Sequence, residues 1–130
     1  MSFDNKNIVK AFLEAAQCRD IETMRRLMDP RAKVVEAASL PYGGEYQGVD
    51  GFLRLVRRVF TTFADIHVDI QDFIAEGEHV AVLATMSGKR KKDGESFEMP
   101  IAEIWHVLNG RIMAIRPFYF DTQEINRLAS

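Results

Sequence analysis

The most informative stretch of this sequence is Phe97-Glu98-Met99-Pro100-Ile101-Ala102-Glu103-Ile104-Trp105-His106-Val107. Its alternation is typical of a β-strand, in which the odd-numbered side chains share one face. Glu103 is then an acid within an apolar row formed by Phe97, Met99, Ile101 and Trp105. Burial disfavours the ionised form, so the pKa of such a carboxyl rises, by up to ~3–5 units when burial is complete. We therefore predict that Glu103 faces a pocket, where it can exchange a proton near neutral pH.

The composition is that of one globular domain. The chain has 130 residues, of which 47% are hydrophobic and 28% charged, and a net charge of −2 with both signs interspersed. This balance favours neither nucleic acid nor an anionic membrane as a partner, and no apolar run approaches the ~18–20 residues that cross a bilayer. A single cysteine, Cys18, excludes an internal disulfide. Together with an N-terminus that lacks a signal-peptide pattern, it predicts a cytoplasmic protein.

Helical periodicity dominates the first half of the chain. Residues 4–17 carry one apolar stripe, and a second helix should begin at the N-cap Asp20 and end at Pro30. Asp50 can cap a third helix, whose apolar face would be Phe52, Leu55, Val56, Val59, Phe60 and Phe63.

Strand alternation replaces this pattern in the second half. A short strand at 34–37 and a loop at 40–48 come before the third helix, and Asn109-Gly110 predicts a tight hairpin. The predicted strands of the second half are 66–71, 80–86, 97–107 and 111–120. Helices followed by a meander of antiparallel strands predict a single α+β domain over residues 1–130, with helices covering one face of a curved sheet.

Several landmarks resemble those of a known superfamily. They are Arg19-Asp20 at the end of a helix, the loop 40–48, and the segments 76–80, 104–112 and 118–122. In this order they resemble the nuclear transport factor 2-like superfamily, and within it the SnoaL-like proteins, over essentially the whole chain. The resemblance implies a cystatin-like cone, a strongly curved antiparallel sheet closed by N-terminal helices around a small-molecule pocket. The superfamily includes ketosteroid isomerase, limonene epoxide hydrolase, scytalone dehydratase, polyketide cyclases and members without known catalysis, so it implies no single reaction.

The resemblance also bears on individual residues. Glu103 resembles the buried acid of the ketosteroid isomerase oxyanion hole, but Phe12 stands where that enzyme has its tyrosine and has no hydroxyl to donate. Near the position of the catalytic base only Glu36 could serve, and only after a shift in the alignment. We therefore predict that the chain is not a ketosteroid isomerase. Asp121 resembles the aspartate at the end of the last strand that is the proposed acid–base group of polyketide cyclases.

The last strand completes the predicted pocket. If it is in phase with the strand of Glu103, then Ile115, Pro117, Tyr119 and Asp121 share the concave side. We predict two catalytic residues, a deep and protonated or proton-sharing Glu103 and an ionised Asp121 near the mouth. The predicted ligand contacts are Tyr119, Trp105, Phe12, Tyr42, Tyr46, Met99 and Phe60.

Each of these residues also has a structural interpretation. Glu103 could pair with an internal arginine such as Arg54 or Arg116, or meet solvent at a strand edge. Asp121 could cap a short helix over residues 122–129. The aromatic residues of the strands could be plain core, and those of the loop could be surface turn residues.

The opposite face of the sheet predicts a partner. Four apolar residues would lie outward on neighbouring strands: Ala102, Ile104, Phe118 and Phe120. Because a monomer rarely exposes such a patch, and SnoaL-like proteins commonly dimerise through this face, we predict a homodimer. His106 should also point outward. The three histidines lack metal-ligand spacing and no glycine-rich phosphate loop is present, so we expect neither a metal nor another cofactor.

Three functional hypotheses remain open. The first is a pocket that acts on a hydrophobic small molecule by cofactor-free proton transfer, such as isomerisation, cyclisation, dehydration or epoxide hydration. The second is a non-catalytic binding module for such a molecule, and the third a scaffold that only dimerises.

Overall fold

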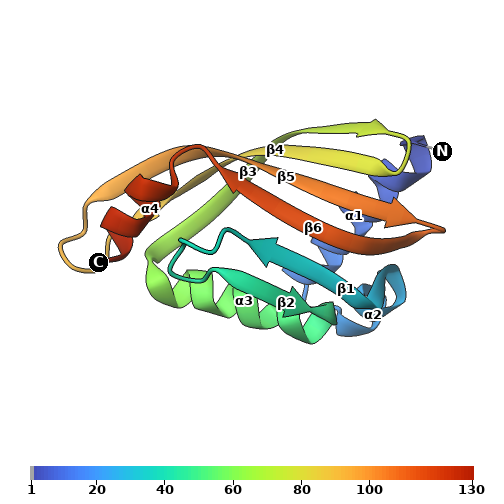
Figure 1. The fold of residues 1–130 in the computed structure, drawn as a ribbon, viewed down its shortest axis with the longest axis horizontal. Helices are drawn as coiled ribbons and strands as arrows, with labels where there is room; N and C mark the ends of the chain where they lie inside the picture. The colour runs from blue at the N-terminus through green and yellow to red at the C-terminus, as the bar shows by residue number, and fades with distance from the viewer. Residues whose placement is uncertain (1) are drawn as a thin grey trace.

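The computed structural model describes residues 2–130, with side chains from Asp4 onward, as an α+β domain (Figure 1). Its elements in chain order are α1 (Ser2–Gln17), α2 (Ile21–Leu27), β1 (Met28–Glu36), β2 (Gly44–Gln47), α3 (Gly48–Thr62), β3 (Ala64–Glu76), β4 (His79–Lys89), β5 (Ser96–Leu108), β6 (Arg111–Tyr119) and α4 (Thr122–Ala129). None of the helices in this part of the chain is long and apolar enough to cross a membrane.

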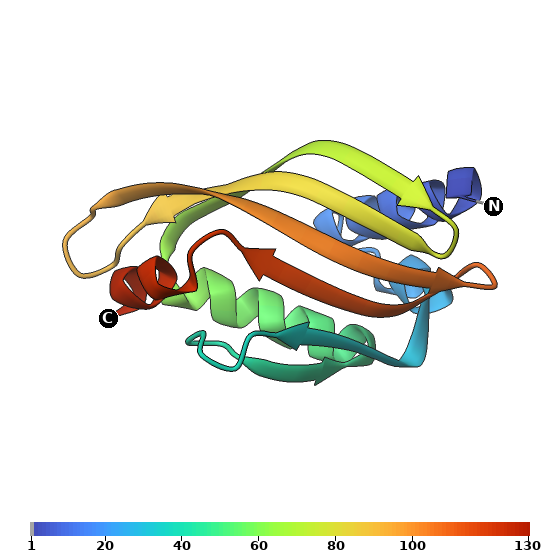
Figure 2. The ribbon, with the colours of Figure 1, turned by 45° about the horizontal axis from the view of Figure 1, so that its top comes forward.

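The six strands form one curved sheet in the order β2-β1-β6-β5-β4-β3. Four of the five neighbouring pairs are antiparallel, including the predicted meander β3 to β6, and the remaining pair, β1 with β6, is parallel. Parallel neighbours cannot be joined by a hairpin and need a longer connection. Here the chain passes through β2 and α3 to the edge strand β3 and returns through β4 and β5, so that β6 lies beside β1. The long strands arch over α1 and α3, which cover the concave face (Figure 2).

The strand phase predicted from Glu103 is confirmed. Met99, Ile101 and Trp105 are buried, whereas Pro100 and Ile104 between them are exposed. β6 is in phase with β5, because Glu103 pairs with Pro117, Trp105 with Ile115 and Ile101 with Tyr119. The concave face therefore carries the side chains of these three pairs.

Several local signals act as predicted. The side chain of Asp20 accepts a hydrogen bond of 3.2 Å from the backbone N–H of Thr23 and caps α2. Asn109 and Gly110 have φ values of 53° and 77°, as a tight hairpin turn of the type I′ class requires. Asp50 lies in the first turn of α3, but the helix begins at Gly48, and the Asp50 carboxylate instead pairs with Arg25 at 2.7 Å.

Two segments differ from the prediction. Strand β1 begins at Met28, directly after α2, so it is much longer than the predicted 34–37 and contains Pro30. Strand β2 lies inside the segment predicted as a loop and pairs with β1. Both differences place more of the first half of the chain in the sheet, and they bring β1 against the strand that carries Tyr119.

Candidate functional site

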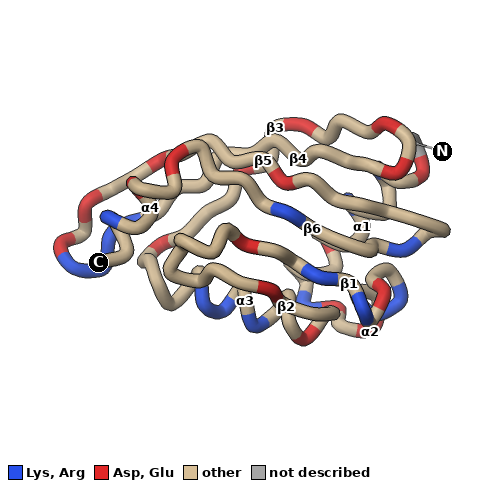
Figure 3. The backbone as a smooth tube through the Cα atoms, in the orientation of Figure 1, with Lys and Arg blue, Asp and Glu red and all other residues tan. Residues whose placement is uncertain are grey.

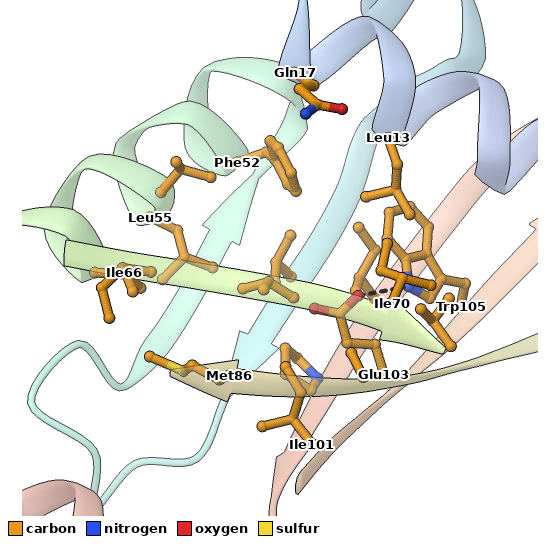
Figure 4. A pocket seen from close by; sticks show the side chains of 18 of the residues that line it. Leu13, Gln17, Phe52, Leu55, Ile66, Ile70, Met86, Ile101, Glu103 and Trp105 are labelled. Carbon is orange, nitrogen blue, oxygen red and sulfur yellow. Dashed lines mark hydrogen bonds between the residues drawn. The ribbon is translucent and has the colours of Figure 1, made fainter. Parts of the chain in front are cut away.

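A cavity of about 760 Å³ lies between the concave face of the sheet and the helices α1 and α3. Figure 4 shows its apolar walls, with Phe52 and Leu55 from α3 facing Ile70, Met86 and Ile101 from the strands. Its polar lining is sparse and includes Glu36, Glu103 and Tyr119. An apolar cavity of this size with a few polar groups is the usual make-up of a small-molecule site.

Glu103 faces this cavity from the middle of β5 (Figure 4). The indole Nε1–H of Trp105 donates a 3.1 Å hydrogen bond to its Oε1. Burial raises the pKa of the Glu103 carboxyl, and the hydrogen bond from Trp105 opposes that rise without reversing it. The neutral form of the acid is thus favoured in the folded protein.

Glu36 is a second buried carboxyl in the same cavity. It ends β1, its side chain is 4% exposed, and its Oε1 has no hydrogen-bond partner. Burial first, and then the neighbouring Glu103, raise the pKa of Glu36 to about 8. The predicted site did not include Glu36. The signal that could have found it is the alternation Ala32, Val34, Glu36 along β1, all buried, which repeats the pattern around Glu103.

A pair of tyrosines stands beside the two acids. Tyr119 lines the cavity, and the hydroxyl of Tyr42 donates a 2.8 Å hydrogen bond to its oxygen. The proton of Tyr119 is therefore left available for a ligand or a carboxylate. Burial raises the pKa of both phenols, so each remains a neutral hydrogen-bond donor at physiological pH.

The structure brings together four of the predicted site residues around the cavity: Glu103, Trp105, Tyr119 and Phe60. Phe60 is 56% exposed and lies on α3. The other predicted ligand contacts do not line the cavity. Met99 is buried in the core, and Phe12 packs edge-on against Trp105 with ring centroids 5.7 Å apart.

The two loop tyrosines also lie elsewhere than predicted. Tyr42 and Tyr46 are buried rather than spread over the mouth of the cavity, because β2 and the turn before it fold onto the sheet. The Tyr46 hydroxyl donates a 2.7 Å hydrogen bond to the carbonyl of Tyr42 and accepts one from Arg58. Tyr42 therefore contributes to the site only through its bond to Tyr119.

Asp121 does not share the cavity with Glu103, contrary to the predicted placement. The strand β6 ends at Tyr119, and the exposed Asp121 side chain accepts a 3.0 Å hydrogen bond from the backbone N–H of Glu124. It caps α4, which is the structural interpretation raised from the sequence. We therefore propose no proton-transfer role for Asp121.

The two arginines suggested as partners for Glu103 do not reach the acids in the described part of the chain. Basic residues lie along α3 and at the turn between β4 and β5 (Figure 3), but the Arg54 guanidinium sits over the ring of Tyr46, 5.3 Å from its centroid. Arg116 is exposed on β6. Within the described residues, no ion pair involves Glu36 or Glu103.

The histidines lie outside the cavity lining. The His106 Nε2 lies 2.7 Å from a carboxylate oxygen of Glu78, and its ring stacks on that of His79. Within the described part of the chain, no cluster of three or more His, Cys, Asp or Glu side chains is arranged to hold a metal ion.

Comparison with known families matches residues 9–115 to the SnoaL-like domain. The chain belongs to the SnoaL-like domain family. It is similar to an NTF2-like protein of unknown function from Burkholderia pseudomallei, with 28% identity, a TM-score of 0.82, and coverage of 100% of this chain and 99% of that one. No curated protein sequence matches it.

Two further solved structures share the fold of this SnoaL-like chain. A candidate SnoaL-like polyketide cyclase from Jannaschia has 16% identity and a TM-score of 0.79 over 100% of this chain and 94% of that one. TerC, co-crystallised with polyporic acid, has 21% identity and a TM-score of 0.80 over 97% of this chain and 98% of that one. At these identities the likeness concerns the fold alone.

Proposed function

We propose that this SnoaL-like chain binds a hydrophobic small molecule in the cavity and that Glu103 exchanges a proton with it. The observation that carries the proposal is a largely apolar cavity of about 760 Å³ with a carboxyl of raised pKa on its wall. Burial favours the neutral form of such an acid, which can protonate a bound group or, once ionised, accept a proton from it. Polyporic acid with TerC and the polyketide cyclase among the structural neighbours support a small-molecule ligand.

Glu36 gives Glu103 a partner for this chemistry. Two interacting carboxyls titrate as a pair, so that one can be ionised while the other keeps its proton. One acid can then donate a proton at one end of a substrate while the other removes one nearby. The reactions that these proton transfers can support without a cofactor are isomerisation, cyclisation, dehydration and epoxide hydration, the last with a water molecule as the attacking group.

A binding module without catalysis is the second candidate, and one observation favours it. Phe12 is fully buried behind Trp105 and offers no hydroxyl, so the oxyanion hole that the ketosteroid isomerase resemblance would require is incomplete. In such a module Glu103 and Tyr119 would only hydrogen-bond the ligand.

The substitution Glu103→Gln separates these two candidates. We expect the variant to keep the fold and to bind hits from a thermal-shift screen of hydrophobic carbonyl compounds and epoxides, while turnover falls by about 10²–10⁴-fold. The control is Glu98→Gln, an exposed acid on the opposite face of the same strand. Undiminished turnover in Glu103→Gln would refute the role of Glu103. A ligand that binds but that neither the wild-type protein nor the variants convert would favour the binding module.

We also propose that the convex face of the sheet holds a second copy of the chain. Exposed apolar side chains stand on four adjacent strands of this face: Ile74, Leu83, Ile104 and Phe118. Leu83 pairs with Ala102, which pairs in turn with Phe118, so the patch is continuous across the strands. Burial of such a patch against a twofold mate removes it from water on both copies.

The double substitution Ile104→Lys and Phe118→Glu is expected to yield a monomer, because it sets charges in the centre of the patch. The wild-type protein should sediment as a dimer in analytical ultracentrifugation at micromolar concentration. Leu108→Lys is the control, since Leu108 is an exposed apolar residue at the β5–β6 turn and outside the patch. A monomeric wild type, or a double variant that stays dimeric, would contradict this interface.

The cytoplasmic location expected from the sequence stays a prediction.

A further inference from the structure

The two buried acids lie in one row across the sheet. Glu103 on β5 pairs with Pro117 on β6. The parallel pairing of β1 with β6 ends at Val34 and Ile115, and two residues further along each strand come Glu36 and Pro117. The carboxyls of Glu36 and Glu103 therefore rise from the concave face on either side of Pro117, and both line the cavity.

Among the residues whose side chains the structure describes, none forms an ion pair with Glu36 or Glu103. The Oε1 atom of Glu36 has no hydrogen-bond partner there, and the Oε1 atom of Glu103 accepts its bond from the neutral indole of Trp105. Lys10 is the single lysine or arginine among the lining residues, and its ammonium group lies over the ring of Phe73, 5.2 Å from the centroid. A buried carboxylate without a counter-ion is costly, so a cation from outside would stabilise the pair.

The cavity lining holds few other titratable groups. Tyr119 on β6 and the Tyr42 hydroxyl behind it are uncharged phenols. The remaining titratable residues of the lining are Lys10, Glu14 and Cys18, all from α1 or the turn after it, while α3 contributes only apolar and aromatic side chains. The charge of the lining is thus dominated by acids, and its walls suit an apolar body with aromatic faces that attract a cation.

We infer that the cavity takes a hydrophobic amine, bound as its ammonium ion between Glu36 and Glu103. This inference rests on the proposed function and names the chemical class of its ligand. An amine that enters as the ammonium ion displaces one carboxyl proton to solvent. An amine that enters as the free base takes the proton from a carboxyl oxygen onto its nitrogen lone pair. Both routes end with the same ammonium–carboxylate pair. The raised pKa of Glu36 fits a site that holds its proton until such a ligand arrives.

The test compares three probes that share one apolar body: 1-aminoadamantane, 1-adamantanol and adamantane-1-carboxylate. Isothermal titration calorimetry at pH 7.5 should give an affinity for the amine at least about tenfold higher than for the alcohol, and no binding of the carboxylate. Glu36→Gln and Glu103→Gln should each weaken the amine by about tenfold or more and leave the alcohol nearly unchanged. Unchanged binding of the alcohol shows that the cavity of each variant is intact. Glu98→Gln is the control and should bind all three probes as the wild-type protein does.

A second readout follows the displaced proton. Titrations of the amine in buffers of different ionisation enthalpy should show release of about one proton in the wild-type protein and less in either variant, and amine affinity should rise between pH 6 and 8.5. Equal affinity for amine and alcohol would overturn the ammonium site and leave the proposed small-molecule function standing. If none of the three probes binds, both the inference and the proposed function fail.

Discussion

Raising the pH from about 4.5 to 8 is expected to lower the free energy of unfolding of the wild-type protein by about 4–5 kcal/mol through Glu36 alone. The pKa of Glu36 is about 8 in the folded protein, against 4.5 for an ordinary glutamate. In this interval the native state binds the proton that the unfolded chain has released, so stability falls as pH rises. The loss is absent below about 4.5 and complete above about 8. Glu103, whose pKa is also raised by burial, changes stability in the same direction.

Glu36→Gln should remove most of this slope, because a neutral amide of similar size replaces the acid. Urea denaturation at pH 5, 6.5 and 8 measures the effect, with Glu98→Gln as the control that keeps the wild-type slope. Carboxylates with lowered pKa values, such as Asp20 and Glu124, lose their native stabilisation only as the pH falls toward and below their ordinary range. They therefore do not account for a loss of stability toward pH 8. A wild-type stability that is flat from pH 5 to 8 would contradict a neutral, buried Glu36.

The part of the site that could be predicted from the sequence depends on local strand alternation. β5 alternates for its whole length, so the inward direction of Glu103 and Trp105 follows from the sequence. The alternation along β1 indicates that Glu36 points inward, but it does not place Glu36 beside Glu103. That placement comes from the parallel pairing of β1 with β6, between segments about 80 residues apart. Local periodicity carries no information about which distant strand lies alongside.

Asp121 shows where the same reasoning fails. Extending the alternation of β6 past Tyr119 assigned Asp121 to the concave face, but a second local signal competes with it. Asp121 followed three residues later by Glu124 is the pattern of a helix N-terminus, and the capping hydrogen bond prevails at the strand end. Tyr42 was misplaced for a related reason, since Gly43 and Gly44 mark a turn but do not reveal that the chain then rejoins the sheet as β2.

Trp105→Ala is expected to lower the free energy of unfolding by about 3–5 kcal/mol. Trp105 is 1% exposed and packs edge-on against Phe12, so its loss joins a new void to the existing cavity and leaves that ring unsupported. Urea denaturation at pH 5, well below the pKa of about 8 of Glu36 in the folded protein, measures this packing effect. A loss of less than about 1 kcal/mol would contradict the packing role.

Trp105→Phe separates packing from the hydrogen bond to Glu103. Phenylalanine retains an aromatic ring against Phe12 but has no N–H, so the bond to the Glu103 Oε1 disappears. Because this bond lowers the pKa of Glu103, we expect the variant to raise that pKa further, which carbon-13 NMR of the side-chain carboxyl measures. The result would assign Trp105 as the residue that positions Glu103 and sets its proton affinity. An unchanged or lower pKa of Glu103 in Trp105→Phe would show that the indole only fills space and does not influence the proton affinity of Glu103.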